Sequence, residues 1–155
     1  MTIVVSRIES ADGFGQFHDL LVEYEASLPT RLRHGVVSGQ RCLRSTYARP
    51  NAAFLASDGR DAVGCVAVTK LDAASALMVR LFVKPERRGL GIARSLVAAV
   101  IRFLQTTQYD RLVLDTDKDE LRAAYDLYKS LGFAECEPYG TVDYESPTFM
   151  ELSLR

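Results

Sequence analysis

The segment over residues 77–95, LMVRLFVKPERRGLGIARS, constrains the fold more than any other part of the chain. Its apolar first part, residues 77–83, predicts a strand that is buried on both faces apart from Arg80 and that a proline then ends. A basic turn with Gly89 and Gly91 follows, and a helical pattern begins at Ile92. Glycines in such a turn let several backbone N–H groups face one concavity, with the positive end of the helix dipole behind them. The segment therefore predicts a binding site for a phosphorylated ligand between a strand and a helix.

The remaining patterns alternate between strands and helices. Alternating or continuous apolar runs predict strands at residues 2–8, 53–56, 62–71, 111–115, 133–136 and 148–154. Apolar residues spaced three and four apart predict helices at residues 14–28, 92–104 and 121–131, and residues 30–50 allow one more short helix. This order predicts a mixed α/β sheet with helices covering its faces.

Length and composition restrict the class of protein. With 155 residues, of which 48% are hydrophobic and 25% charged, the chain predicts one domain over residues 1–155. Such a domain buries a core without disulfides or metal, and we expect no metal site. The formal net charge of −1 argues against a nucleic-acid partner. Three scattered cysteines, with no pattern of a signal peptide or membrane span, predict a cytoplasmic protein that has no membrane partner.

Four motifs and the order of elements resemble the GNAT superfamily of acyl-CoA-dependent N-acetyltransferases. The family's cofactor signature, [Q/R]-x-x-G-x-[G/A], matches RGLGIA at residues 88–93. The preceding LFVKPE, the later strand RLVLDT and the helix end LYKSLGF at residues 127–133 are also similar to family motifs. The resemblance covers residues 52–137. It implies a GNAT fold, with a mostly antiparallel sheet of about seven strands flanked by about four helices.

The resemblance makes the phosphorylated ligand acetyl-CoA, bound as a cosubstrate. The strand residues Leu81, Phe82 and Val83 would pair with the pantetheine arm through main-chain hydrogen bonds. The pyrophosphate would lie against the turn, whose implied binding residues are Arg88, Gly89, Leu90, Gly91, Ile92, Ala93 and Arg94. Tyr125 is either a wall of the cofactor site or a packing residue. A nucleotide site is the rival interpretation, but the chain lacks both G-x-x-x-x-G-K-[S/T] and G-x-G-x-x-G.

Acyl transfer to an amine needs a proton acceptor, a stabilised carbonyl oxygen and a proton for the leaving thiolate. By the resemblance, a backbone N–H near Phe82 or Val83 polarises the carbonyl and Tyr128 is the general acid. A buried ring with a solvated hydroxyl is the alternative interpretation of Tyr128. The general base departs from the family pattern, because Leu77 stands where relatives carry a strand glutamate. Leu121 likewise stands at a frequent asparagine position.

The remaining candidates for the base are Asp115, Glu23, His34 or a chain of water molecules. Asp115 equally suits a cap or an ion pair with an arginine. Arg80 is a charge inside an apolar strand, so it must be paired or face a cavity. It predicts either a clamp for a substrate carboxylate or an ion pair with an internal acid such as Asp115.

Two segments of the family fold flank the acceptor site, here residues 14–34 and the loop over residues 137–147. Together with Arg80, the arginines of the first segment favour a small-molecule or amino-acid-like primary amine. The amine would attack the thioester directly in a ternary complex. One alternative is an acyl-CoA-binding sensor with little catalysis, and another is acetylation of a protein N-terminus or lysine. The resemblance also allows a homodimer, because exposed C-terminal strands of this family often pair.

Overall fold

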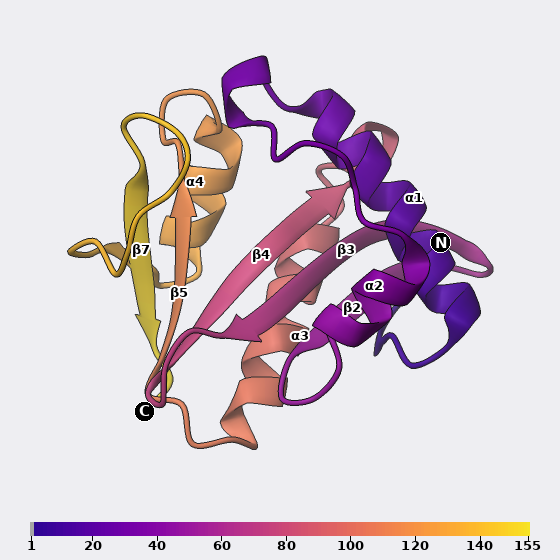
Figure 1. Cartoon of the computed structure of the whole chain (residues 1–155), viewed down its shortest axis with the longest axis horizontal. Coiled ribbons are helices and arrows are strands. Elements are labelled where there is room, and N and C mark those ends of the chain that lie inside the picture. The colour runs from indigo at the N-terminus through magenta and orange to yellow at the C-terminus, as the bar shows by residue number, and fades with distance from the viewer. Residues whose placement is uncertain (1) are drawn as a thin grey trace.

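A mixed sheet runs through the middle of the computed structural model, which describes residues 2–155 (Figure 1). Its seven strands lie in the order β1-β2-β3-β4-β5-β7-β6. Neighbouring strands are antiparallel, apart from the parallel pair of β4 and β5. The strands are β1 (Ile3–Arg7), β2 (Ala52–Asp58), β3 (Asp61–Lys70), β4 (Ser75–Val83), β5 (Arg111–Thr116), β6 (Ala134–Glu135) and β7 (Thr148–Ser153).

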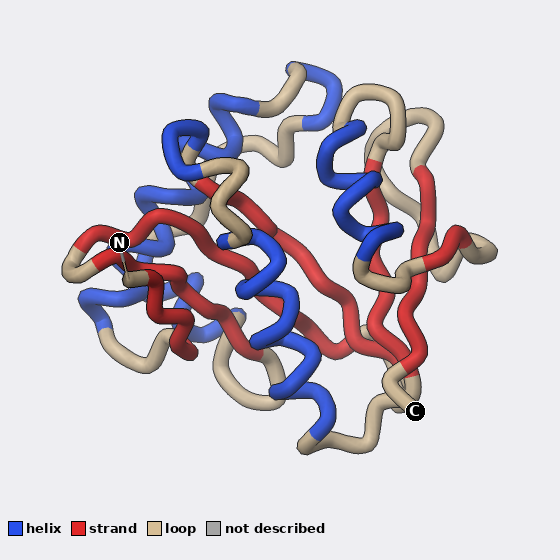
Figure 2. The backbone as a smooth tube through the Cα atoms, turned by 180° about the vertical axis from the view of Figure 1, so that it is seen from behind, coloured by secondary structure: helices blue, strands red, loops and turns tan. Residues whose placement is uncertain are grey.

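Helices cover both faces of this sheet, and their positions define two apolar cores. The helices are α1 (Ala11–Ser27), α2 (Gln40–Thr46), α3 (Ile92–Gln105) and α4 (Arg122–Ser130), with single 3-10 turns η1 (Thr30–Leu32) and η2 (Pro85–Arg87). α1 and α2 lie on one face, whereas α3 and α4 lie on the other (Figures 1 and 2). The larger core lies under α3 and α4, and the smaller core under α1 and α2.

Local signals explain where the helices begin. The side chain of Ser10 accepts a hydrogen bond from the backbone N–H of Gly13 at 3.0 Å and so caps α1. Before α4, a carboxylate oxygen of Asp117 accepts from the backbone N–H groups of Asp119 and Glu120, at 3.0 and 2.8 Å. The Ser10 contact satisfies an N–H group that the start of α1 would otherwise leave without a partner, whereas the Asp117 contacts order the turn that leads into α4.

The predicted order of elements and the mixed α/β fold are confirmed, with two corrections. The strand predicted at residues 133–136 is limited to β6, because only Ala134 and Glu135 pair with β7. The prediction that residues 77–83, apart from Arg80, are buried on both faces is wrong at Leu77, Val79 and Leu81. Residues 79–81 are only half-buried, because β5 pairs with β4 no further than Leu77.

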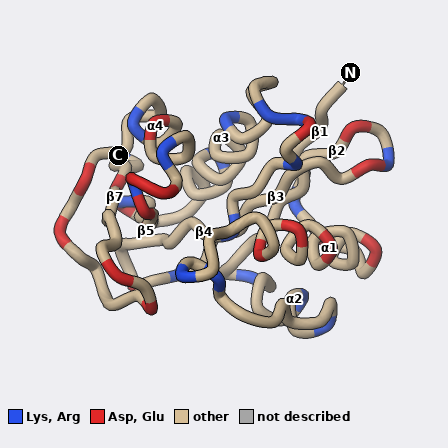
Figure 3. Tube along the Cα trace, turned by 90° about the horizontal axis from the view of Figure 1, so that it is seen from above, with Lys and Arg blue, Asp and Glu red and all other residues tan. Residues whose placement is uncertain are grey.

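Charged side chains of both signs are distributed over the molecule. Figure 3 shows Lys and Arg interspersed with Asp and Glu along the trace, in keeping with the net charge of −1. Within residues 2–155, no helix combines the length and apolar character needed to cross a membrane.

Candidate active site

The separation of β4 from β5 creates the candidate site. The two strands pair through Leu77, whereas β5 continues beside β7 as far as Thr116. β4 also bulges: Val79 lies opposite Ala67 and Phe82 opposite Cys65, so two residues of β4 face one residue of β3. Beyond the bulge, β4 stays paired with β3 on one edge. Its other edge, which faces β5, has no paired strand within the described residues and borders the space between the two strands.

One cavity, of about 680 Å³, lies between this part of β4 and α4; we call it the turn cavity. Its lining includes these predicted cofactor residues: Leu81, Phe82, Val83, Arg88, Gly89, Gly91, Ile92, Ala93 and Arg94. Two further predicted residues lie outside the lining. Leu90 is exposed on the turn, and Tyr125 is buried on α4, where its hydroxyl donates to Glu135 at 2.7 Å. The structure thus brings most, but not all, of the predicted set together.

The β4–α3 turn has the properties of an anion site. Gly89 and Gly91 adopt left-handed backbone conformations, with φ of 78° and 81°. Within the described residues no side chain caps α3, so its first-turn N–H groups remain available to a ligand. Arg88 and Arg94 line the same cavity; Arg88 Nε donates to the carbonyl oxygen of Val83 at 3.0 Å. Positive charge and aligned N–H groups therefore meet at one mouth of the turn cavity.

A second cavity, of about 490 Å³, opens on the side of η1 and the 137–147 loop; we call it the loop cavity. Its charged lining combines Arg31, Arg33, His34, Arg80, Asp115 and Asp143. The two cavities share four lining residues, namely Tyr24, Leu81, Asp115 and Tyr128. They therefore meet at one junction, where groups bound in each cavity can come into contact.

Tyr128 lies at this junction with a buried ring, which packs on Phe133 at 5.7 Å between ring centroids. Its hydroxyl has no hydrogen-bond partner among residues 2–155. In that part of the chain, every side-chain oxygen that is fully buried does have a partner, so the Tyr128 oxygen is not fully buried. The hydroxyl is therefore accessible from the cavities. Burial raises the pKa of Tyr128, and the neighbouring Tyr24 and Asp115 raise it further. Burial likewise raises the pKa of Tyr24 to about 12, so both phenols are protonated at neutral pH.

A buried carboxylate at the end of α1 connects three segments of the loop cavity. Glu25 accepts from the backbone N–H of His34 at 2.9 Å and contacts its ring Nδ1 at 2.6 Å. Nη1 of Arg80 lies 3.6 Å from the same carboxylate. Arg80 thus lies beside an internal acid, as one of its two predicted alternatives has it, but that acid is Glu25 and not Asp115. Sequence reasoning missed Glu25, although its position four residues after Leu21 places it on the buried side of α1.

Asp115 lies at the end of β5, where the 137–147 loop folds over it. Its two oxygens accept hydrogen bonds from the hydroxyls of Tyr139 and Tyr144, at 2.7 and 2.8 Å. Burial raises the pKa values of both phenols, and the Asp115 carboxylate raises them further. Glu23, another predicted candidate for the base, lines neither cavity within the described chain and pairs with Lys84 at 3.5 Å.

Comparison with known sequences identifies the family. A sequence model of the acetyltransferase (GNAT) family matches residues 17–133. The chain belongs to the GNAT family. It is 36% identical over 111 residues to an uncharacterised N-acetyltransferase of Schizosaccharomyces pombe, a match that covers 70% of this chain and 68% of that protein. An uncharacterised N-acetyltransferase of Dictyostelium discoideum is 45% identical over 83 residues, which cover 50% of this chain and 36% of that longer protein.

GNAT proteins of known structure share the fold over almost the whole chain. An acetyltransferase from Salmonella typhimurium, solved with its cofactor acetyl-CoA, superimposes with a TM-score of 0.81 at 15% identity. The match covers 99% of this chain and 94% of that one. Membership of the GNAT family makes this chain an acyltransferase of the N-acetyltransferase type.

The GNAT site of this chain fits a coenzyme A thioester, which carries a pyrophosphate and a long amide-containing arm. The uncapped start of α3 and the left-handed Gly89 and Gly91 suit the pyrophosphate. A side-chain Cβ at either glycine would meet nothing within 4 Å, so the mouth of the turn cavity is open to a ligand. The strand edge of β4 beyond Leu77 suits the amides of the arm.

Proposed function

We propose that the chain transfers an acetyl group from acetyl-CoA to the primary amine of a small, amino-acid-like acceptor. The amine attacks the thioester directly, with both substrates bound. The meeting of the two cavities at Tyr128 is the observation that carries the proposal. Direct transfer needs two sites that open onto one point, since the reacting atoms must approach to about 3–3.5 Å.

Acetyl-CoA occupies the turn cavity and supplies the acetyl thioester. Backbone N–H groups from Arg88 to Arg94 hold its pyrophosphate, and residues 81–83 pair with its arm. This binding directs the thioester toward the junction. A backbone N–H near Phe82 polarises the carbonyl oxygen, as an oxyanion hole does. Tyr128, protonated at neutral pH because burial raises its pKa, gives its proton to the departing sulfur.

The acceptor occupies the loop cavity, and Arg80 binds its carboxylate. The other two arginines of the lining have their guanidinium groups engaged: Arg31 with Asp117, and Arg33 Nε with the Leu28 carbonyl at 3.1 Å. Arg80 has one ionic neighbour, Glu25, at a distance longer than a hydrogen bond. Its guanidinium therefore keeps donors for a bidentate contact with a carboxylate.

The test is thiol release from acetyl-CoA with a panel of free amino acids, their amides, polyamines and short peptides. We expect release that depends on the acceptor and favours amino acids over their amides. Arg80→Gln should raise the KM for amino acids about 10- to 100-fold, the effect of losing one charged hydrogen bond. The KM for the amides should change little. If polyamines or peptides are the better substrates and Arg80→Gln leaves their KM unchanged, the acceptor proposal is wrong. Binding of acetyl-CoA without turnover would instead indicate a sensor.

A further inference from the structure

The pair formed by Glu25 and His34 has a chemical role that follows from its contacts. We propose that His34 is the group that takes the proton from the acceptor ammonium, and that Glu25 positions its ring. This inference rests on the proposed function, because it concerns the proton balance of the same site. It resolves a difficulty in the sequence, where Leu77 occupies the position of the family's strand glutamate.

The hydrogen bonds of the pair determine which ring nitrogen can act. A carboxylate only accepts hydrogen bonds, so the Nδ1 that lies 2.6 Å from Glu25 carries the hydrogen. In the neutral ring, Nε2 then bears the lone pair, and no described residue donates to it. Glu25 also accepts the backbone N–H of His34, so the carboxylate holds this residue at two points. Such double anchoring fixes both the tautomer and the direction of Nε2.

The position of His34 suits exchange with both substrate and solvent. Its side chain lines the loop cavity and is 51% exposed, whereas that of Glu25 is 10% exposed. The ring stacks against Tyr24 at 6.1 Å between centroids, and Tyr24 lies at the junction with Tyr128. His34 can therefore receive a proton inside the cavity and release it to water outside.

The competing acids are less suited to this role. Each oxygen of Asp115 already accepts a tyrosine hydroxyl, from Tyr139 and Tyr144. Glu23 pairs with Lys84 and lines neither cavity within the described residues. Imidazole is also the side chain whose charge normally changes between pH 5 and 8, the range in which a base must both accept and release protons.

The proton balance requires two protons to leave the ammonium. His34 takes the first and releases it to solvent, which leaves a neutral amine. As the bond from nitrogen to the acetyl carbon forms and the carbon–sulfur bond breaks, Tyr128 gives its proton to the sulfur. The second amine proton restores Tyr128. The products are the amide, the free thiol and one proton in solution.

Several charged groups act on the imidazole from the elements around it. From α1, Glu25 favours the protonated ring. From β4, Arg80 opposes it. Arg31 and Arg33 on its own segment oppose protonation as well, and from the opposite wall Asp143 and Asp115 favour it; the neutral phenols of Tyr24 and Tyr144 complete the surroundings. Among the charged groups of the described residues, Glu25 is the one in direct contact with the ring, so Glu25→Gln tests its positioning role.

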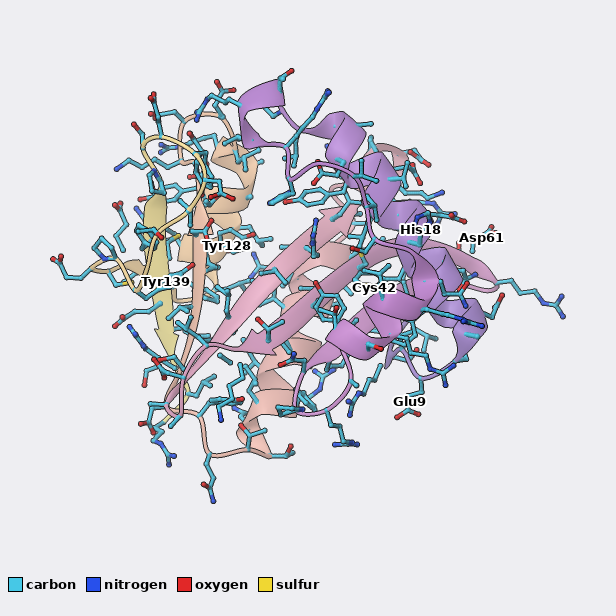
Figure 4. All side chains as sticks on the ribbon, viewed as in Figure 1. Glu9, His18, Cys42, Asp61, Tyr128 and Tyr139 are labelled. Carbon is cyan, nitrogen blue, oxygen red and sulfur yellow. The ribbon has the colours of Figure 1, made fainter. Side chains whose placement is uncertain are left out.

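The experiment compares wild type with five variants of the whole chain: His34→Gln, His34→Ala, Glu25→Gln, Asp115→Asn and His18→Gln. His18 is the matched control, because it is the other histidine of the chain, lines neither cavity within the described residues and lies on α1 well apart from Tyr128 (Figure 4). Thiol release with the best amino acid of the panel is measured between about pH 5.5 and pH 9. Calorimetric binding of acetyl-CoA and circular dichroism report whether each variant keeps its donor site and its fold.

We expect His34→Gln to lower kcat/KM at neutral pH by about 100-fold. The rise with pH between 5 and 8 should disappear, while acetyl-CoA binding stays within two-fold of wild type. Glu25→Gln should lower kcat/KM but keep the rise with pH and the binding of acetyl-CoA, because the ring loses the carboxylate that orients it. His34→Ala, which leaves room for a base, should regain activity when imidazole is added, an effect that a purely structural role would not produce.

The result that overturns the inference is an active wild type with a His34→Gln variant of the same pH profile and activity. Loss of the pH-dependent rise in Asp115→Asn, but not in His34→Gln, would assign the role to Asp115 instead. A folded wild type that binds acetyl-CoA but releases no thiol with any acceptor would reject the proposed function, and the inference with it.

Discussion

Two tyrosines on α4, one helical turn apart, provide the sharpest test of the proposed chemistry. Both rings are buried, but their hydroxyls differ in their surroundings. The hydroxyl of Tyr128 has no partner within residues 2–155 and faces the junction of the cavities. The hydroxyl of Tyr125 donates to Glu135 at 2.7 Å and ties α4 to β6. Replacing each tyrosine by phenylalanine removes one oxygen atom and leaves the packing of the ring in place.

The two substitutions should have opposite consequences. Tyr128→Phe removes no hydrogen bond, so the free energy of unfolding should stay within about 0.5 kcal/mol of wild type. If the hydroxyl is the general acid, kcat should fall about 100-fold, which corresponds to about 2.7 kcal/mol of transition-state stabilisation. Tyr125→Phe removes a hydrogen bond to a carboxylate, so it should lower the midpoint of thermal unfolding. Its kcat should remain close to that of wild type.

Thermal unfolding followed by circular dichroism, together with thiol release at saturating acetyl-CoA, measures both effects. Because burial raises the pKa of Tyr128, its proton should still be present at about pH 9, where the comparison can be repeated. A Tyr128→Phe variant with full kcat would refute the acid role and make Tyr128 a packing residue. Equal losses of kcat in the two variants would show that α4 responds as a whole, and not through one hydroxyl.

Two further predictions concern the mouth of the turn cavity and the turn before α4. Gly91→Ala should cost about 1–2 kcal/mol, because φ is 81° while the added Cβ meets nothing within 4 Å. The midpoint of thermal unfolding should fall by roughly 2–8 °C, and calorimetry should show weaker acetyl-CoA binding. The control is Gly140→Ala, which is also in open space but outside the left-handed region and should lose little. Asp117→Asn should destabilise the fold most above about pH 4, since hydrogen bonds from the Glu120 N–H and from Arg31 hold the pKa of Asp117 below its ordinary value. Urea unfolding at several pH values should show the difference from wild type shrinking as the pH falls through the folded-state pKa, and a difference independent of pH would contradict this.

The parts of the fold that the sequence predicts are those with strong local patterns. Residues 92–105 form a helix because their apolar residues recur with helical spacing, and residues 112–114 form the buried centre of a strand because they are continuously apolar. The turn between β4 and α3 is predicted for a different reason. Glycine is the residue that most easily adopts the left-handed backbone conformation, and both Gly89 and Gly91 adopt it.

The acceptor side of the site is much less predictable. Helical spacing places Glu25 on the buried side of α1, but nothing local indicates that His34 and Arg80 lie beside it. Those contacts depend on how the irregular segment after α1 folds back, which is a property of tertiary packing. The same limit applies to the 137–147 loop, whose two tyrosines reach Asp115 from positions with no regular pattern.

The bulge in β4 connects these two sides of the site, because it changes which face each following residue occupies. In a regular strand, alternate residues share a face, so Arg80 and Phe82 would lie with Met78 in the core under α3 and α4. The extra residue at Arg80, with φ of 63°, shifts the alternation by one position. Leu81 then packs with the α3 and α4 core, whereas Phe82 packs in the α1 core against Tyr24, at 5.7 Å between ring centroids. A charged side chain in an otherwise apolar strand thereby reaches Glu25 in the loop cavity, and the residue after it lines the junction. The left-handed conformation is unfavourable for arginine by about 1–2 kcal/mol, but burying the unpaired guanidinium in the apolar core would cost several kcal/mol more.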